Sequence, residues 1–334
     1  MAATGRLRRA DCSIQGIRRH RRGGGFSYQD AEGSPIGDEE TLARIRELAI
    51  PPAWKEAWIC PDPLGHIQAT GIDEAGRKQY LYHSRWQQRQ AERKFEAVRE
   101  FAATLPRLRR AVSRDLKLEG MPRERALACA VRLLDLGFFR IGGEQYAEEN
   151  ESYGVATVRR EHVVVDGEEV IFDFPAKSGQ RRVQSIRDPE AREAIEAMRR
   201  RRSGPDDLLA FKEGGAWRDV RSDDVNAYIQ EKVGEGFSAK NFRTWHGTVL
   251  AAAELAGASP TSKAATKRAI NAAVERVAAL LGNTPAVCRA SYIDPRVLDC
   301  FRDGVTIGAA RSDGGRLSRR ARARLEREVL ELVS

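Results

Sequence analysis

The chain has 334 residues, and 57 Lys and Arg against 48 Asp and Glu give a formal net charge of +9 and an isoelectric point near 9.5. At about 150 residues per domain, this length suggests two domains that each bury a core of their own. A hydrophobic content of 41% excludes wholesale disorder, and no stretch approaches the roughly 18 apolar residues of a membrane span. The positive charge makes nucleic acid or another polyanion the first partner to consider.

Residues 1–22 form a basic arm with seven arginines and no apolar segment of the kind found in secretory signals, so we expect a cytoplasmic protein. The five cysteines are scattered and form no C-x-x-C pair, which argues against a disulfide framework and a zinc knuckle. The histidines lack metal-ligand spacing, and the glycines at 23–25 lack the neighbours that a phosphate-binding loop needs. We expect no metal, no nucleotide cofactor, and a flexible hinge at 23–25.

The first 90 residues have the character of a small strand-rich domain. β-forming residues cluster between turn residues at 26–28, 58–60, 66–70 and 79–82. One helix is predicted at 38–48, where apolar side chains share a face and two prolines follow at 51 and 52. We place the end of this domain near residue 90.

From about residue 91 the pattern is helical and strongly charged, with apolar residues at three- and four-residue spacing over 91–112 and 123–136. A hairpin interrupts the helices, because Asp166-Gly167 suits a tight turn between strands at 162–165 and 168–174. A second turn at 175–179 leads to a third strand near 182–184. The sequence therefore predicts a three-stranded meander inside a helical domain.

Further helices are predicted from capping residues that precede apolar-periodic runs. They begin at Asp188-Pro189, Ser222, Ser238, Ser262 and Thr284-Pro285, the run from Ser262 ends at Gly282, and a last amphipathic helix covers 316–332. The expected fold class is α+β: a β-rich N-terminal domain at 1–90 and a mainly α-helical domain with a three-stranded sheet at 91–334.

Four segments carry the chemistry, and their order and spacing are what make them informative. They read FFRIG at 138–142, FPAKSG at 174–179, KNFRTWHGT at 240–248 and GNTPAVCRASYI at 282–293. Together they resemble the type IB DNA topoisomerases of the bacterial and poxvirus group. The segment RKQYLY at 77–82 also resembles the DNA-contacting N-terminal part of that family, so the resemblance covers both predicted domains.

The resemblance implies a DNA breaking-rejoining fold and assigns a role to each matched residue. Tyr292 is the nucleophile, because a phenol can hold the broken strand as a phosphotyrosyl ester. Arg140 and Arg243 match the two family arginines, whose planar guanidinium groups contact the negative charge of the transition state bidentately.

The fourth and fifth catalytic positions are a lysine and an amide. Lys177, on a hairpin turn, matches the general acid that protonates the departing 5′-oxygen. Asn283, nine residues before Tyr292, stands where the family has His or Asn, and we expect it to stabilise charge rather than transfer protons.

The matched DNA-contacting residues are expected to touch bases or phosphates: Gln79, Tyr80, Tyr82, Tyr146 and Lys240. Gly143 and Gln145 stand where the poxvirus branch has lysines, which is a departure from that branch. The implied activity is relaxation of positive and negative supercoils of double-stranded DNA by a monomer, without ATP or metal. In the cell we expect such a protein in the cytoplasm, associated with the nucleoid.

Two other functions fit parts of the pattern. A tyrosine recombinase uses two arginines, a lysine and a tyrosine in the same way, but its second arginine segment normally has His at the position of Lys240. A non-catalytic basic DNA-binding protein would use the same residues only for phosphate contacts. Each residue alone also has an ordinary interpretation: a packed tyrosine, a solvated arginine or an exposed turn lysine.

Overall fold

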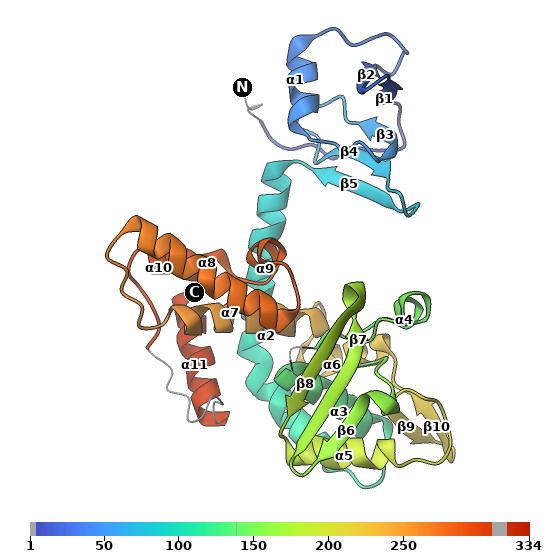
Figure 1. Cartoon of the computed structure of the whole chain (residues 1–334), viewed down its shortest axis with the longest axis vertical. Coiled ribbons are helices and arrows are strands. Elements are labelled where there is room, and N and C mark those ends of the chain that lie inside the picture. Colours follow the sequence, from blue (N-terminus) through green and yellow to red (C-terminus); the bar gives the residue numbers. More distant parts are fainter. Residues whose placement is uncertain (1–4, 138, 309–318) are drawn as a thin grey trace. The chain divides into compact units, whose positions relative to one another are not determined.

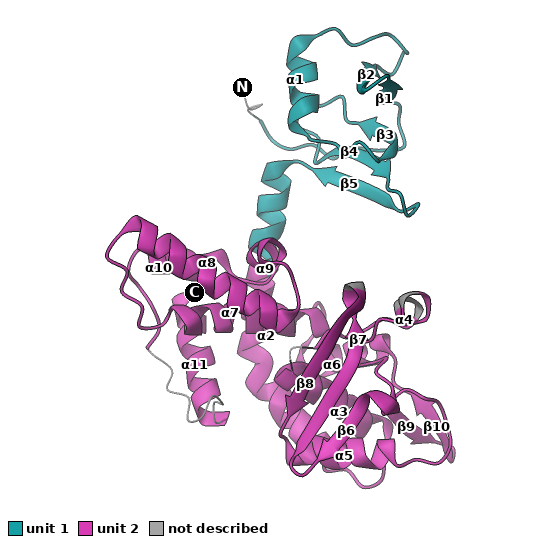
Figure 2. Cartoon of the chain, viewed as in Figure 1, with its two compact units in different colours: residues 1–94 teal, residues 95–334 magenta. Residues whose placement is uncertain are grey.

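The structure, a computed structural model, describes residues 5–137, 139–308 and 319–334, with the backbone only for Gln145, Tyr146, Asn150 and Ser178. It divides into two compact units, Met1–Lys94 and Phe95–Ser334, which Figure 2 colours separately. Phe138 of the FFRIG segment and residues 316–318 at the expected start of the last helix lie outside the described residues.

The N-terminal unit is built on a five-stranded antiparallel sheet in the order β2-β1-β3-β4-β5 (Figure 1). Its strands are β1 (Ile17–Arg22), β2 (Gly25–Gln29), β3 (Lys55–Ile59), β4 (Ile67–Ile72) and β5 (Lys78–Tyr82). Helix α1 (Glu39–Glu47) begins after Asp38, whose carboxylate accepts from the N–H of Thr41 at 2.8 Å. Ile45 of α1 packs into a small core with Ile17 and Ile59 from the sheet.

The predicted hinge at residues 23–25 is wrong, and the end of the basic arm is a strand. β1 pairs with both β2 and β3, and Gly23 takes a φ of +53° in the tight turn between β1 and β2. The sequence pattern did not indicate this strand, because four of its six residues are arginines. Arg19, for example, donates to the carbonyl oxygens of Ile50, Pro51 and Trp54 and therefore serves the fold.

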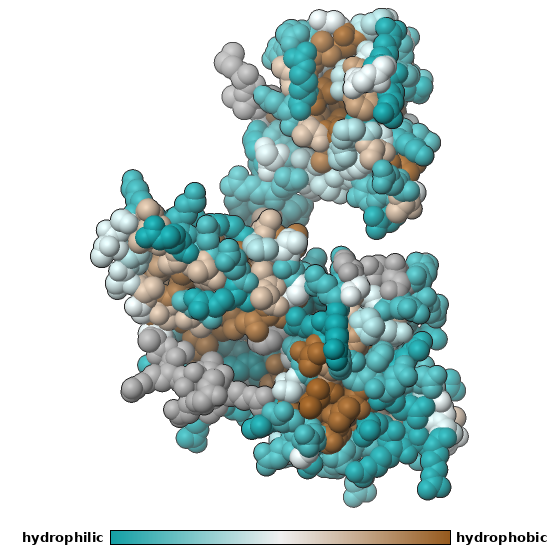
Figure 3. Space-filling model, in the orientation of Figure 1, coloured by the Kyte–Doolittle hydropathy of each residue, from teal (hydrophilic) through white to brown (hydrophobic). Residues whose placement is uncertain are grey.

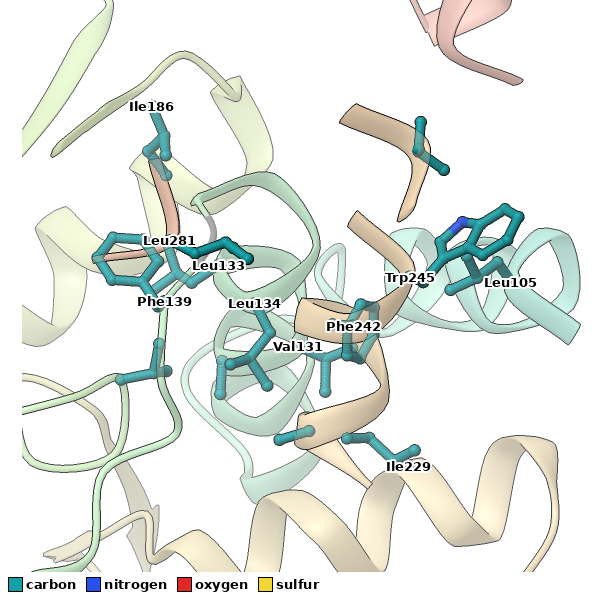
Figure 4. Close-up of a cluster of buried hydrophobic side chains, with 14 of the residues drawn as sticks. Leu105, Val131, Leu133, Leu134, Phe139, Ile186, Ile229, Phe242, Trp245 and Leu281 are labelled. Carbon is teal, nitrogen blue, oxygen red and sulfur yellow. The ribbon is translucent and has the colours of Figure 1, made fainter. Parts of the chain in front are cut away.

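The C-terminal unit is mainly helical. Helix α2 (Ser84–Asp115) begins in the first unit and continues into the second. The other helices are α3 (Arg123–Gly137), α4 (Glu144–Asn150), α5 (Pro189–Arg199), α6 (Ser222–Val233), α7 (Ala239–Leu255), α8 (Lys263–Leu281), α9 (Pro285–Ser291), α10 (Pro295–Arg302) and α11 (Arg319–Leu332). In α3, 12 of 15 residues are buried, and in α7, 12 of 17; Figure 4 shows Leu134 of α3 beside Phe242 of α7 in the core.

The predicted three-stranded meander is present as β6 (Val163–Asp166), β7 (Glu169–Ala176) and β8 (Gln180–Ile186). The sheet buries Val170, Phe172 and Phe174 against the helices, whereas Val164 and Val183 on its other face are exposed. Figure 3 shows a brown patch over this sheet on a largely hydrophilic surface. The α+β class is therefore confirmed.

Helix starts were predicted well where a capping side chain marks them. Asp188, Ser262 and Thr284 each accept from a backbone N–H in the first turn of α5, α8 and α9. The hairpin of β9 (Ala210–Glu213) and β10 (Ala216–Asp219) was not predicted, and neither were α4 and α10. These elements have four to eight residues, which is too short for a clear periodic pattern.

The C-terminal helix α11 is joined to the core through buried ion pairs. Asp135 of α3 accepts from Nε of Arg109 at 2.9 Å and from Nη2 of Arg322, on α11, at 2.7 Å. Burial by itself would raise the pKa of Asp135, but Arg322 and Arg109 hold it well below its usual range. Arg322 Nη2 also lies 3.0 Å from Nε2 of His246, so α11 supports helix α7.

Candidate active site

Four of the five predicted catalytic residues meet where α8 ends and α9 begins. Arg140 Nη2 donates to the carbonyl oxygen of Gly282 at 2.7 Å and to Oδ1 of Asn283 at 2.8 Å. Arg243 Nη2 donates to the carbonyl oxygen of Leu281 at 2.7 Å, and its Cζ lies 5.2 Å from the ring centre of Tyr292. Three distant segments of the sequence thus converge on one helix end.

The end of α8 attracts these arginines because its last carbonyl groups lack helical partners. Gly282 ends the helix in the left-handed conformation, with φ of +62°. The N–H groups of Gly282 and Asn283 donate to the carbonyl groups of Ala279 and Ala278, and those of Leu280 and Leu281 are left to side-chain donors. The last turn of α8 has no basic residue of its own. Arg140 and Arg243 supply the positive charge that the negative end of the helix dipole favours.

The guanidinium groups at this helix end repel one another. Burial, followed by the positive charge of Arg140, lowers the pKa of Arg243 to about 10, while the charge and a hydrogen bond of the Tyr292 side chain oppose the shift. Arg182, the third arginine here, also has a lowered pKa, because of burial and then Arg140. An anion that entered this cluster would relieve the repulsion, so the site suits a negatively charged group.

Asn283 has a hydrogen-bond donor to offer. Its Oδ1 accepts from Arg140, and its Nδ2 has no partner within the described part of the chain. A side-chain amide keeps both N–H groups when its oxygen is engaged, and it carries no titratable proton. The contact with Arg140 therefore orients the amide as a neutral donor.

Helices α9 and α7 hold the backbone of Tyr292. Its N–H donates to the carbonyl oxygen of Cys288 at 2.9 Å, and its carbonyl oxygen lies 3.5 Å from Oγ1 of Thr248. A Cβ on Gly247 would lie 2.4 Å from the same carbonyl oxygen. Helix α7 thus carries Arg243 and, one turn later, the residues against which the tyrosine segment packs.

This close approach makes Gly247→Ala a sensitive test of the packing. Within a helix, Gly to Ala normally adds up to about 1 kcal/mol of stability. Here we expect the reverse sign, a loss of about 1–3 kcal/mol, because the new methyl group must displace the Tyr292 carbonyl. Urea unfolding of both proteins measures the difference, and a variant more stable than the wild type would contradict the packing described here.

Lys177 lies in the 3₁₀ turn Lys177–Gly179 at the tip of the β7–β8 hairpin, where it is exposed. The described contacts do not join it to the other four residues. Strand β8 itself does reach them, through Arg182, which the sequence analysis did not single out. The alternation of side chains along β8 could have indicated Arg182, because Arg182 and Gln184 share the less exposed face of the strand.

In the N-terminal unit, two of the predicted DNA-contacting residues form an exposed aromatic pair on edge strand β5. Tyr80 and Tyr82 are 41% and 39% exposed, and their rings stack at a centroid distance of 6.1 Å. Lys78 Nζ lies 5.8 Å from the Tyr80 ring centre. Gln79 faces the other side of the strand and donates through Nε2 to Oδ2 of Asp73 at 2.9 Å, so its role differs from that of the tyrosines.

Of the remaining residues predicted to contact DNA, Lys240 is exposed in the first turn of α7, three residues before Arg243. The side chain of Tyr146, on α4, lies outside what the structure describes. No cluster of metal-ligating side chains is present in residues 5–137, 139–308 and 319–334. Over the same ranges, no helix is long and apolar enough to cross a membrane.

Two family matches agree with this arrangement. Residues 83–302 match the family described as eukaryotic DNA topoisomerase I, catalytic core, and residues 25–73 match the family described as bacterial DNA topoisomerase IB, N-terminal domain. These matches show that the chain is a DNA topoisomerase. More narrowly, the chain belongs to the type IB family and is a type IB enzyme that acts on DNA.

Viral and fungal topoisomerases are similar to this chain in sequence. DNA topoisomerase 1B of Acanthamoeba polyphaga mimivirus is 30% identical over 299 residues, which is 87% of this chain and 88% of the relative. DNA topoisomerase I of Monkeypox virus is 23% identical over 285 residues, 81% and 85% of the two chains. DNA topoisomerase 1 of Schizosaccharomyces pombe is 27% identical over 165 residues, 49% of this chain and 19% of the relative.

Proposed function

We propose that this enzyme relaxes positive and negative supercoils by cutting one strand of duplex DNA with Tyr292 and rejoining it. The observation that carries the proposal is the convergence of Arg140, Arg243 and Asn283 beside the tyrosine at the end of α8. The cut end would turn about the intact strand, driven by torsion in the DNA, so that no ATP is needed.

In the proposed cleavage step, one phosphoester bond of the DNA is exchanged for another. Tyr292 Oη attacks the phosphorus, the bond from phosphorus to the 5′-oxygen breaks, and a 3′-phosphotyrosyl ester and a free 5′-hydroxyl result. The phenol proton is lost to solvent, and the Lys177 ammonium gives a proton to the departing 5′-oxygen. The ester keeps the phosphate activated, so the 5′-hydroxyl can attack back without an energy source.

Arg140 and Arg243 would leave the carbonyl groups of α8 for the phosphate oxygens as the transition state develops charge. A charged oxygen is a stronger acceptor than a neutral carbonyl, so the exchange favours the reaction. Asn283 would donate its free N–H to a non-bridging oxygen. In the proposed cycle the five side chains supply the nucleophile, the general acid and the charge stabilisation, so it needs no metal ion.

DNA binding would use the basic and aromatic residues outside the catalytic cluster. Tyr80 and Tyr82 offer stacking or sugar contacts and Lys78 a phosphate contact, supported by their exposure on one face of β5. Gln79, Tyr146 and Lys240 complete the proposed set. We also propose that the enzyme acts as a monomer on nucleoid DNA in the cytoplasm.

Plasmid relaxation in EDTA and without ATP tests the proposed function. We expect supercoils of both signs to be relaxed, and detergent added during the reaction should trap a covalent protein–DNA adduct. Positively and negatively supercoiled plasmids run in parallel serve as matched substrates. A plasmid that stays supercoiled, with no adduct, would contradict the proposal and favour a non-catalytic DNA-binding protein, with paired-site DNA as the test for a recombinase.

A further inference from the structure

Arg182 on strand β8 reaches the same end of α8 as Arg140 and Arg243. Its Nη1 lies 3.5 Å from the carbonyl oxygen of Ala279, and its Nη2 donates to the carbonyl oxygen of Leu280. Its Nε donates to Oε1 of Gln184 at 3.2 Å. Two nitrogens of this guanidinium therefore link the sheet to the helix, and the third holds the side chain to a neighbour on its own strand.

Arg182 lies in the β7–β8 hairpin close to the turn that carries Lys177. Arg182 pairs with Phe174, and two residues nearer the tip Gln180 pairs with Ala176. Lys177 follows in the turn. Val170 and Ile186, at the other end of the hairpin, are buried in the core and fix its root, and Arg182 ties the strand to α8 just before the exposed tip.

We propose that Arg182 is a positioning residue that holds the β7–β8 hairpin against the end of α8, so that Lys177 can reach the departing 5′-oxygen. This inference rests on the proposed function. A planar guanidinium that contacts two successive carbonyl groups fixes a direction as well as a distance, which a single ammonium cannot do. Proton transfer is sensitive to such placement, since a displacement of about 1 Å can slow a reaction about 10²-fold.

The role can be tested by changing the leaving group. One duplex carries the ordinary 5′-oxygen at a cleavage site mapped with the wild type, and the other carries sulfur at that bridging position. A thiolate leaves without protonation, because a thiol is far more acidic than an alcohol, so loss of the general acid should matter only for the oxygen duplex. Single-turnover cleavage is measured with protein in excess.

We expect Arg182→Ala to cut the oxygen duplex about 10²-fold more slowly than the wild type and the sulfur duplex within about threefold of it. Lys177→Ala should show the same selective rescue. Arg182→Lys should fall between Arg182→Ala and the wild type on the oxygen duplex. Rapid cleavage of the sulfur duplex would also show that each variant is folded.

Arg181→Ala is the matched control. Arg181 is the next residue on the same strand, but its Nε donates to Oδ1 of Asp173 at 2.7 Å and not to α8. It should cleave both duplexes at close to the wild-type rates.

Three results would overturn the inference. They are normal cleavage of the oxygen duplex by Arg182→Ala, equal slowing on both duplexes, and lack of rescue for Lys177→Ala. The absence of any adduct with the wild type would instead overturn the proposed function itself.

Discussion

Tyr292→Phe is expected to bind duplex DNA as tightly as the wild type and to form no covalent adduct. The change removes only the phenolic oxygen and leaves a ring that still packs 5.2 Å from the guanidinium carbon of Arg243. Without that oxygen no phosphotyrosyl ester can form, so we expect relaxation to fall below detection. Plasmid relaxation, detergent trapping and a binding titration on the same preparation measure the three properties.

A second tyrosine provides the control for this substitution. Tyr228 donates through its hydroxyl to Oδ2 of the buried Asp115 at 2.7 Å, away from the α8–α9 junction. Tyr228→Phe should therefore cost stability, about 1–3 kcal/mol for the carboxylate left without this donor, yet leave the adduct intact. Relaxation that persists in Tyr292→Phe would remove Tyr292 from the mechanism.

The separation between what could and could not be predicted follows the range of the interactions. Capping residues such as Ser262 and Thr284, and the turn at Asp166-Gly167, act within a few residues, so the sequence reveals them. The family resemblance supplied the five catalytic positions, and four of them converge in the structure.

The contacts that position those residues are long-range and leave no local pattern. Arg182 contacts the carbonyl groups of residues almost a hundred positions later in the sequence. Arg19 donates to carbonyl groups in a loop about thirty positions later. In the sequence, both look like ordinary members of basic stretches. The sequence pattern alone cannot distinguish an arginine that donates to main-chain carbonyl groups from one that contacts solvent or phosphate.

Arg243→Ala is expected to slow single-turnover cleavage by about 10³-fold, because the guanidinium offers two donors and the loss of one such donor typically costs 10²–10³. Arg243→Lys should recover only part of this, since an ammonium keeps the charge without the planar pair of donors. Cleavage of a suicide duplex with protein in excess measures both rates. A rate for Arg243→Ala within about tenfold of the wild type would show that the contact is not made in the transition state.

A buried arginine elsewhere in the same unit controls for packing. Arg201 is 6% exposed, close to the 5% of Arg243, and donates to the carbonyl oxygens of Met198 and Leu208. Arg201→Ala should lower the melting temperature without changing the cleavage rate.

Comparing the rates of cleavage and rejoining distinguishes stabilisation of the transition state from stabilisation of a ground state. Cleavage and rejoining pass through the same transition state, so an arginine that acts only there lowers both barriers equally. Arg243→Ala should then slow rejoining of a preformed adduct by the same factor as cleavage and leave the fraction of cleaved DNA at equilibrium unchanged. A smaller fraction of cleaved DNA in Arg243→Ala would mean that Arg243 also stabilises the phosphotyrosyl ester. Its position beside the Tyr292 ring would allow such a contact.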